Sequence, residues 1–417
     1  MRFKSAKSQL GFAHIFMALG LVFLAVAIGY AGVRVFNKNK DRSANGQTSS
    51  SILSSNGSAE SKAIAAGKML SNNKCQGTSK LTFTHLPMNQ SDFGFLIPYG
   101  DVIGGHVTPI DHEYFTPAQY NSPRDSYPVY AMADATIVDI QPRVTPNHGT
   151  DYRLIFAHSC TSLYYYDLLT DLSGAAKDAY AAHGEGVNLP VKAGDQVGMI
   201  GGQTLDFALW DTNTVLTGFV NPASYDAEAW KIHTTDPFPS YTPALRAIMV
   251  SRDPRTAVPI AGKIDHDIDG KLIGNWFVQG SGGYHDTANT SQDYWKGHLS
   301  IAPNVYDPSV FVISIGDFGG QALQFIAIGN TPDPATVDTN SGLVKYDLAD
   351  YRYQKADGTM WDNMTYTQNP KPVATSDNRG CLLVQLTQKQ LLKAEGFPGQ
   401  TCSAISSFDS AAKTYTR

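Results

Sequence analysis

A chain of 417 residues is too long for one ordinary domain and long enough for two, each with an apolar core of its own. Charged residues make up only 17% and the formal net charge is -5, which excludes the basic field of a nucleic-acid-binding protein. The 21 Tyr, 19 Phe and 37 Gly, with few long helical runs, predict a mainly β fold.

The N-terminal residues predict a membrane anchor. Residues 1–10 are short and basic, and residues 11–33 carry no formal charge. A helix of this length, rising about 1.5 Å per residue, spans a hydrocarbon core of about 30 Å. We expect an uncleaved single-pass transmembrane helix in the cell membrane, with residues 1–10 in the cytoplasm and the rest of the chain extracellular. A cleaved signal peptide is the alternative.

A segment rich in Ser, Asn and Gly follows, over residues 34–74. It holds too little apolar surface to offset the entropy lost on ordering, which predicts a flexible stalk. Within it, residues 59–70 have the pattern of a weak helix.

A first β unit is predicted at residues 75–223. Short alternating segments bounded by glycines favour antiparallel strands, and the alanine-rich residues 173–184 predict one short helix. The predicted strands are 81–85, two within 128–140, 152–158, 162–168, 189–201 and 204–210.

A second β unit is predicted at residues 258–417, after a connector, 224–257, in which residues 243–250 favour a helix. Closely spaced strands predict a small β-barrel or sandwich. A capping-box pattern after the last strand predicts a helix at 388–395. The predicted strands are two within 261–278, 298–302, 310–315, 323–328, 343–348 and 381–386.

The four cysteines predict disulfides in an oxidising compartment, because none lies in a zinc-binding Cys-x-x-Cys pattern. Three pairings are possible. We prefer Cys75 with Cys160 and Cys381 with Cys402, since the latter pair closes a short loop. Free buried thiols are the alternative.

Two motifs suggest a metal site. His106 lies in a Gly-x-His motif and is followed by Asp111 and His112, while Thr204 and Asp206 come about a hundred residues later. Histidine and aspartate are both ordinary zinc ligands. A bend near Pro109 would bring His112 rather than His106 to the cleft, and alternation along a strand predicts that Asp111 and His112 do not both face inward.

The order of motifs along the first unit adds to this interpretation. The sequence has Gly-x-His at 104–106, Pro-Val-Tyr-Ala at 128–131, Ala-Thr-Ile-Val at 135–138, a strand ending at His158, Tyr-x-x-Leu at 165–168 and Val-x-x-Gly-x-x-Val-Gly at 191–198. This order resembles a lysostaphin/LytM-type zinc endopeptidase domain of the duplicated-hybrid-motif fold, over about residues 95–222.

The resemblance implies a set of site residues. In such domains the His and Asp of a His-x-x-x-Asp motif and the second His of a His-x-His motif hold one zinc, and two further histidines assist the metal-bound water. His106 matches the first ligand, Asp111 matches the second with one extra residue of spacing, and Asp206 occupies the place of the third. Thr204 and Asp167 stand where the two helper histidines are expected.

These replacements predict a degenerate site. Two carboxylates would neutralise a dication and make its water less acidic, and no histidine is left to stabilise the oxyanion. We therefore expect no cofactor and a non-catalytic binding or scaffolding role at the cell wall, with a cell-wall polymer or an envelope protein as partner. The alternative is a zinc-dependent cell-wall endopeptidase with Asp167 as general base. His158 is expected to be a hydrogen-bonded structural residue.

The second unit leaves two further interpretations open. Its aromatic residues could stack on sugars in a carbohydrate-binding module, although core packing explains them more simply. They are Trp276, Phe277, Tyr284, Tyr294 and Trp295. The residues from Asp265 to Gly270 resemble the start of a calcium loop but lack its closing Glu, so we expect a hairpin turn there.

Overall fold

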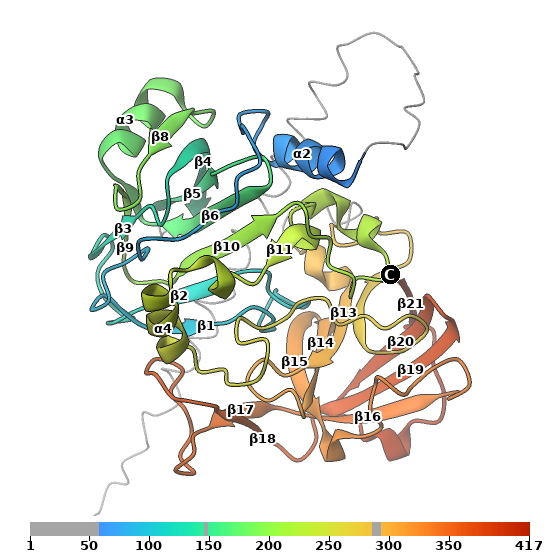
Figure 1. The fold of residues 1–417 in the computed structure, drawn as a ribbon. Coiled ribbons are helices and arrows are strands. Elements are labelled where there is room, and N and C mark those ends of the chain that lie inside the picture. The colour runs from blue at the N-terminus through green and yellow to red at the C-terminus, as the bar shows by residue number, and fades with distance from the viewer. Residues whose placement is uncertain (1–57, 146–148, 286–292) are drawn as a thin grey trace, which may run out of the picture.

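The computed structural model describes residues 58–145, 149–285 and 293–417, and it confirms a mainly β fold with few helices (Figure 1). The predicted transmembrane segment, 11–33, lies outside the described residues. Within the described ranges, no helix combines the length and the apolar character needed to cross a bilayer.

Three α-helices lie in the described part of the chain: α2 Ala59–Leu70, α3 Gly174–His183 and α4 Pro243–Arg252. All three fall where the sequence predicts a helix. The Ser58 hydroxyl accepts a hydrogen bond from the Ser61 backbone N–H and so caps α2. Helix α2 packs closely on the body of the protein, because a Cβ at Gly67 would lie 1.7 Å from the carbonyl oxygen of Cys160.

The first unit is built on one antiparallel sheet with the order β1-β2-β10-β6-β5-β4-β8, and β11, from the predicted connector, also pairs with β10. A smaller sheet, β3-β9-β7, lies beside it. The predicted strand at 81–85 makes only an isolated bridge, between Phe83 and Tyr241. The strands are β1 Phe93–Ile97, β2 Glu113–Pro117, β3 Tyr127–Tyr130, β4 Ala135–Thr145, β5 Gly149–Ala157, β6 Ser162–Leu169, β7 Asp171–Leu172, β8 Leu189–Val191, β9 Gln196–Ile200, β10 Leu205–Asp211 and β11 Thr234–Thr235.

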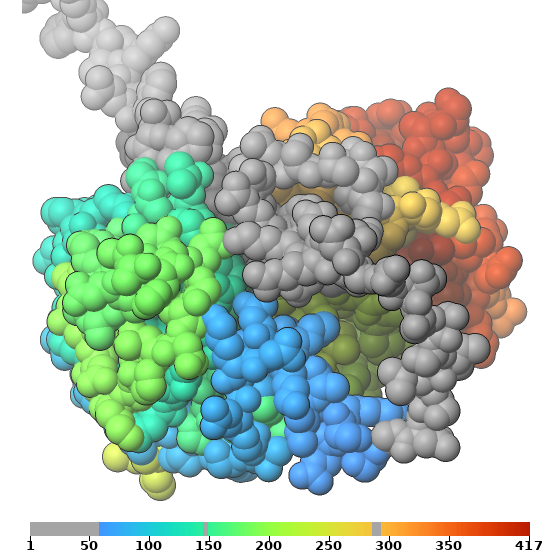
Figure 2. Space-filling view, turned by 90° about the horizontal axis from the view of Figure 1, so that it is seen from above, coloured from blue at the N-terminus to red at the C-terminus, as the bar shows by residue number. Residues whose placement is uncertain are grey.

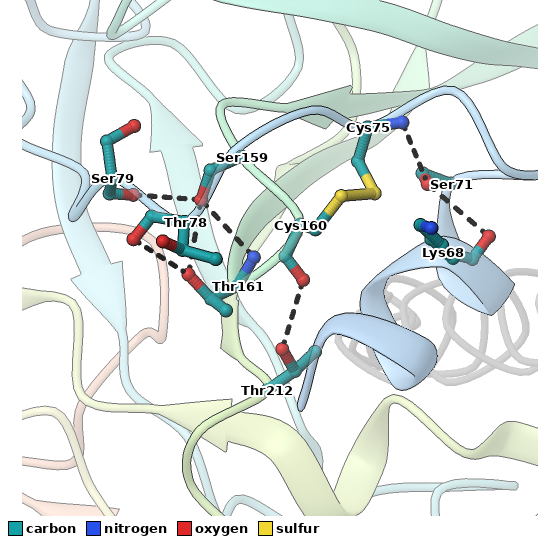
Figure 3. Close-up of a disulfide and its surroundings, with 9 residues drawn as sticks. All are labelled: Lys68, Ser71, Cys75, Thr78, Ser79, Ser159, Cys160, Thr161 and Thr212. Atoms are coloured by element: carbon teal, nitrogen blue, oxygen red, sulfur yellow. Dashed lines mark hydrogen bonds between the residues drawn. A yellow bond between two sulfur atoms is a disulfide. The ribbon is translucent and has the colours of Figure 1, made fainter. Parts of the chain in front are cut away.

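Both preferred disulfides are confirmed. Cys75 is bonded to Cys160, and Cys381 to Cys402. The first bond joins the chain just after α2 to the turn between β5 and β6 (Figure 3). Hydrogen bonds fix both of its ends, since the Cys75 N–H donates to the Ser71 hydroxyl and the Cys160 carbonyl accepts from Thr212.

The second unit contains a closed eight-stranded barrel with the order β12-β13-β14-β15-β16-β19-β20-β21. A two-stranded sheet, β17-β18, extends from it (Figure 1). The strands are β12 Gly274–Val278, β13 His298–Pro303, β14 Phe311–Phe318, β15 Gln321–Ala327, β16 Val344–Ala349, β17 Tyr351–Gln354, β18 Lys371–Ala374, β19 Gly380–Gln388, β20 Leu391–Pro398 and β21 Lys413–Thr416.

The predicted helix at 388–395 is wrong. These residues turn directly into strand β20, whose Leu392 and Ala394 belong to the barrel core while Leu391 and Lys393 are only half-buried. This period-2 pattern is that of a strand. Gly396 does not stop a helix but makes room for a neighbour, since a Cβ there would lie 2.7 Å from the Phe318 ring.

The expected hairpin turn near Asp269 and Gly270 is also wrong, because only one strand, β12, forms within 261–278. Aspartates in this segment instead accept backbone hydrogen bonds: Asp265 from Gly218, and Asp267 from Val220 and Asn275. The contacts with Gly218 and Val220 tie the start of the second unit to the end of the first.

The two units share an apolar cluster. The cluster that fills the first sheet continues into Phe277, Tyr284, Tyr294 and Trp295 of the second unit. Seen from above, the teal and green residues of the first unit lie on one side of the view, and the orange and red residues of the second unit lie on the other (Figure 2). The aromatics singled out in the sequence are all buried, so core packing is confirmed for them.

Candidate functional site

Three neighbouring strands bring most of the predicted site residues together at one end of the first sheet. Asp206 of β10 lies directly opposite Asp167 of β6 and, on its other side, opposite Tyr114 of β2. Residues paired in this way direct their side chains to the same face of a sheet. Asp111 and His112 immediately precede β2, so they reach the same end.

His112 lies between two carboxylates. Its Nδ1 is 3.1 Å from Oδ1 of Asp111, and its Nε2 is 3.5 Å from Oδ2 of Asp206. All three side chains are buried. The expectation that Asp111 and His112 do not both face inward is therefore wrong, because both residues lie in a bend ahead of the strand, where strict alternation does not apply.

The connector supplies a cation to this group. Nζ of Lys231 lies 3.0 Å from Oδ1 of Asp111 and 3.2 Å from Oε2 of Glu228, and the Trp230 indole N–H donates to Oδ2 of Asp111 at 3.0 Å. Burial alone would raise the pKa of Asp111, but Lys231 and His112 hold it below its usual range. Asp111 is thus an ionised carboxylate with a protein ammonium beside it.

The residues contributed by the connector were missed in the sequence. Trp230 is 119 residues from Asp111, so no local spacing pairs them. The available signal was a Glu-x-x-Lys pair, Glu228 and Lys231, with a tryptophan between them in a chain poor in charge. Such a pair is more often a solvated ion pair on the surface.

Asp167 is held by two arginines. Arg143 Nε donates to its Oδ1 at 2.6 Å and Arg153 Nε donates to its Oδ2 at 2.8 Å, while all three side chains are buried. Burial alone would raise the pKa of Asp167, but the two guanidinium groups lower it. A carboxylate bound in this way is a poor proton acceptor, so the arrangement does not favour Asp167 as a general base.

Asp206 has a different environment from the other two aspartates. Burial and the charge of Asp167 raise its pKa well above the ordinary value. Thr204 donates to its Oδ1 over a long 3.5 Å, and its Oδ2 has no hydrogen-bond partner among the described residues. His112 Nε2 is likewise without a hydrogen-bond partner there. Asp206 and His112 thus each keep one buried polar atom without a hydrogen bond among the described residues.

The other two candidate histidines, His106 and His158, lie in different places. The His106 ring lies 5.8 Å from the His112 ring, and burial, with His112 and Lys231 nearby, lowers its pKa to about 3. His158 is outside this group, because its Nδ1 bonds the Asp134 carbonyl at 2.8 Å and its Nε2 bonds the Ser79 hydroxyl at 3.2 Å. Both contacts of His158 are structural.

The residues present do not fit a catalytic zinc ion. Such an ion needs several donors converging at about 2.0–2.3 Å and an open position for water. Within the described ranges, no three His, Cys, Asp or Glu side chains are placed to hold a metal. The Asp111 carboxylate faces an ammonium at 3.0 Å, which would repel a dication at the same oxygen.

No family model matches the chain, and no curated protein matches it. Among solved structures it is similar to a zinc-containing peptidase from Vibrio cholerae, with 18% identity, 32% of this chain and 37% of that chain covered, and a TM-score of 0.23. It is similar to Csd3 of Helicobacter pylori, with 14% identity, 34% of each chain covered and a TM-score of 0.22. It is also similar to lysostaphin, with 11% identity, 82% of this chain and 92% of that chain covered, and a TM-score of 0.24.

The matched part of this chain thus spans about a third of the length of the first two of these proteins. TM-scores below 0.25 carry no argument about mechanism.

Proposed function

We propose that this chain is a membrane-anchored cell-envelope protein whose LytM-like β unit binds or scaffolds at the cell wall without cutting it. The proposal includes the anchor at 11–33, the extracellular placement of the remainder, and the division into units at 75–223 and 258–417. Its expected partner is a cell-wall polymer or another envelope protein.

One observation carries the proposal. Protein cations neutralise two of the carboxylates that the resemblance assigns to metal binding and catalysis: Lys231 neutralises Asp111, and Arg143 and Arg153 neutralise Asp167. A hydrolytic site needs a ligand set free to bind its ion and a base free to accept a proton. Here both functions are occupied by groups of the protein itself.

The test is metal analysis of the purified protein combined with digestion of isolated peptidoglycan. We expect substoichiometric zinc, no digestion, and retention of the protein on isolated cell wall. His106→Ala and Asp206→Ala should leave all three results unchanged. His158→Ala is the matched control, since His158 lies apart from the candidate site. Stoichiometric zinc with digestion, both lost in His106→Ala and Asp206→Ala but kept in His158→Ala, would overturn the proposal.

A zinc endopeptidase is the second candidate. The observation that favours it is the pair of unsatisfied ligand-type atoms, His112 Nε2 and Asp206 Oδ2, which lie 3.5 Å apart. Adding His112→Ala to the same experiment separates the two candidates, because that variant would lose zinc only if His112 and its neighbours hold it. A carbohydrate-binding module has no such support, since the aromatics offered for stacking are buried.

A further inference from the structure

Lys231, Asp111 and Glu228 form a buried group of one amine and two carboxyls. Nζ of Lys231 lies 3.0 Å from Oδ1 of Asp111 and 3.2 Å from Oε2 of Glu228. We propose that Lys231 and Asp111 become joined by an intramolecular isopeptide bond, with Glu228 as the catalytic residue that carries the proton. This inference goes beyond the proposed function and does not depend on it, because an amide would withhold Asp111 from a metal ion just as the ion pair does.

The three groups are arranged for amide formation. The nucleophile and the carboxyl belong to segments 120 positions apart in sequence, yet the fold holds them at hydrogen-bonding distance, which replaces a bimolecular encounter by a fixed one. Oε2 of Glu228 lies 3.2 Å from the same nitrogen. A carboxylate there is within reach of the proton that Nζ must release.

The surroundings of the group would protect an amide once it had formed. Nζ of Lys231 lies 4.4 Å from the centre of the Tyr284 ring, and Trp230 covers the other oxygen of Asp111. All of these side chains are buried, so little water is available to hydrolyse an amide once it forms. Two buried charges are costly to desolvate, and a neutral amide removes that cost.

The reaction balances without an oxidant or a cofactor. One proton of the Nζ ammonium moves to the Asp111 carboxylate, and the neutral amine attacks Cγ. Oδ2 carries the negative charge that develops, where the Trp230 N–H already donates at 3.0 Å. Glu228 takes a second proton from Nζ and passes it to Oδ1. The Cγ–Oδ1 bond breaks, one water leaves, and the Nζ–Cγ amide remains.

Distance alone does not single out this pair. Lys177 and Asp171 lie 2.7 Å apart, as do Lys192 and Asp134, but both pairs are solvent-exposed. Among the described residues, neither of these two ammonium groups forms a salt bridge with a second carboxylate. Water would compete there for both partners. The burial and the second carboxylate are what distinguish Lys231.

Mass spectrometry of the full chain tests the proposal. After disulfide reduction and denaturation, the intact mass should be lower than that of the unlinked chain by one water. Trypsin should leave Lys231 uncut and release a branched peptide in which residues 81–124 are linked to residues 193–246. Neither segment contains cysteine, so no disulfide can mimic the link.

Variants assign the roles of the residues. Lys231→Arg keeps the charge but should abolish the branched peptide and the loss of water. Glu228→Gln should leave most of the chain unlinked. Lys177→Arg, which changes the exposed pair, should retain the full loss of water. A wild-type protein that yields the separate linear peptides ending at Arg124 and Lys231 would overturn the proposal, whatever the folding of the variants. That result would leave the zinc and digestion measurements unaffected.

Discussion

Removing the carboxylate of Asp167 should strongly destabilise the first unit. Asp167 accepts hydrogen bonds from Arg143 at 2.6 Å and from Arg153 at 2.8 Å, and none of the three residues is more than 4% exposed. Asp167→Ala would leave two buried guanidinium groups facing one another without their shared anion. Removing one partner of a buried ion pair costs about 3–5 kcal/mol.

The measurement is the free energy of unfolding from denaturant titration with both disulfides intact, followed by tyrosine and tryptophan fluorescence. Asp134→Ala is the matched control, because its ion pair with Lys192 is exposed and should add nothing measurable. Asp167→Asn should fall between wild type and Asp167→Ala, since it keeps the shape but loses the charge. Equal midpoints for Asp167→Ala and Asp134→Ala would refute the assignment of Asp167 as the anion of a structural network.

Three further perturbations test other parts of the fold. Burial raises the pKa of Asp101 to about 7, so the stabilisation from its protonated carboxyl is present at low pH and is lost as pH rises through about 7. Asp101→Asn should flatten the pH dependence of the free energy of unfolding between about pH 4 and 7. At pH 8 the variant should be more stable by about 2 kcal/mol, allowing for partial exposure of the side chain. Replacing both Cys381 and Cys402 by Ser opens a loop of 21 residues and should lower the free energy of unfolding by about 3 kcal/mol relative to the oxidised protein. A reduced wild type that is more stable than this variant would contradict the assignment of the loss to the disulfide. Neither carboxyl oxygen of the fully buried Glu113 has a hydrogen-bond partner among the described residues. Glu113→Met should therefore raise the thermal midpoint and increase the free energy of unfolding by about 1–3 kcal/mol. A lower thermal midpoint would show that the carboxyl has a partner in the folded protein.

The sequence was informative where local pattern decides structure. Strands β5, β6 and β10 were predicted because their apolar residues lie in short runs between glycines and turns. The helix predicted at 388–395 failed because a capping-box pattern outweighed the alternation of Leu392 and Ala394. The alternate side chains are buried only because the barrel closes and pairs β20 with β19 and β21.

The candidate site was predictable only in part. The resemblance selected Asp111, Asp206 and Asp167 as candidates, and the strand order brings them to one end of one sheet. It could not indicate the cations that neutralise two of them. Arg143 and Arg153 come from the neighbouring strands β4 and β5, and Lys231 from a connector with no strand pattern. Those contacts depend on tertiary packing, which the spacing of residues along the sequence does not predict.

The position of the first disulfide determines how this protein would respond to mechanical load. Tension applied ahead of Ser58 reaches helix α2 first, and the helix can peel from the surface only until Cys75 is taut (Figure 3). From there the force passes through the covalent bond to Cys160, at the turn between two central strands of the sheet. In the oxidised protein, pulling from the N-terminal side would thus bypass residues 76–159, which would bear load only after reduction.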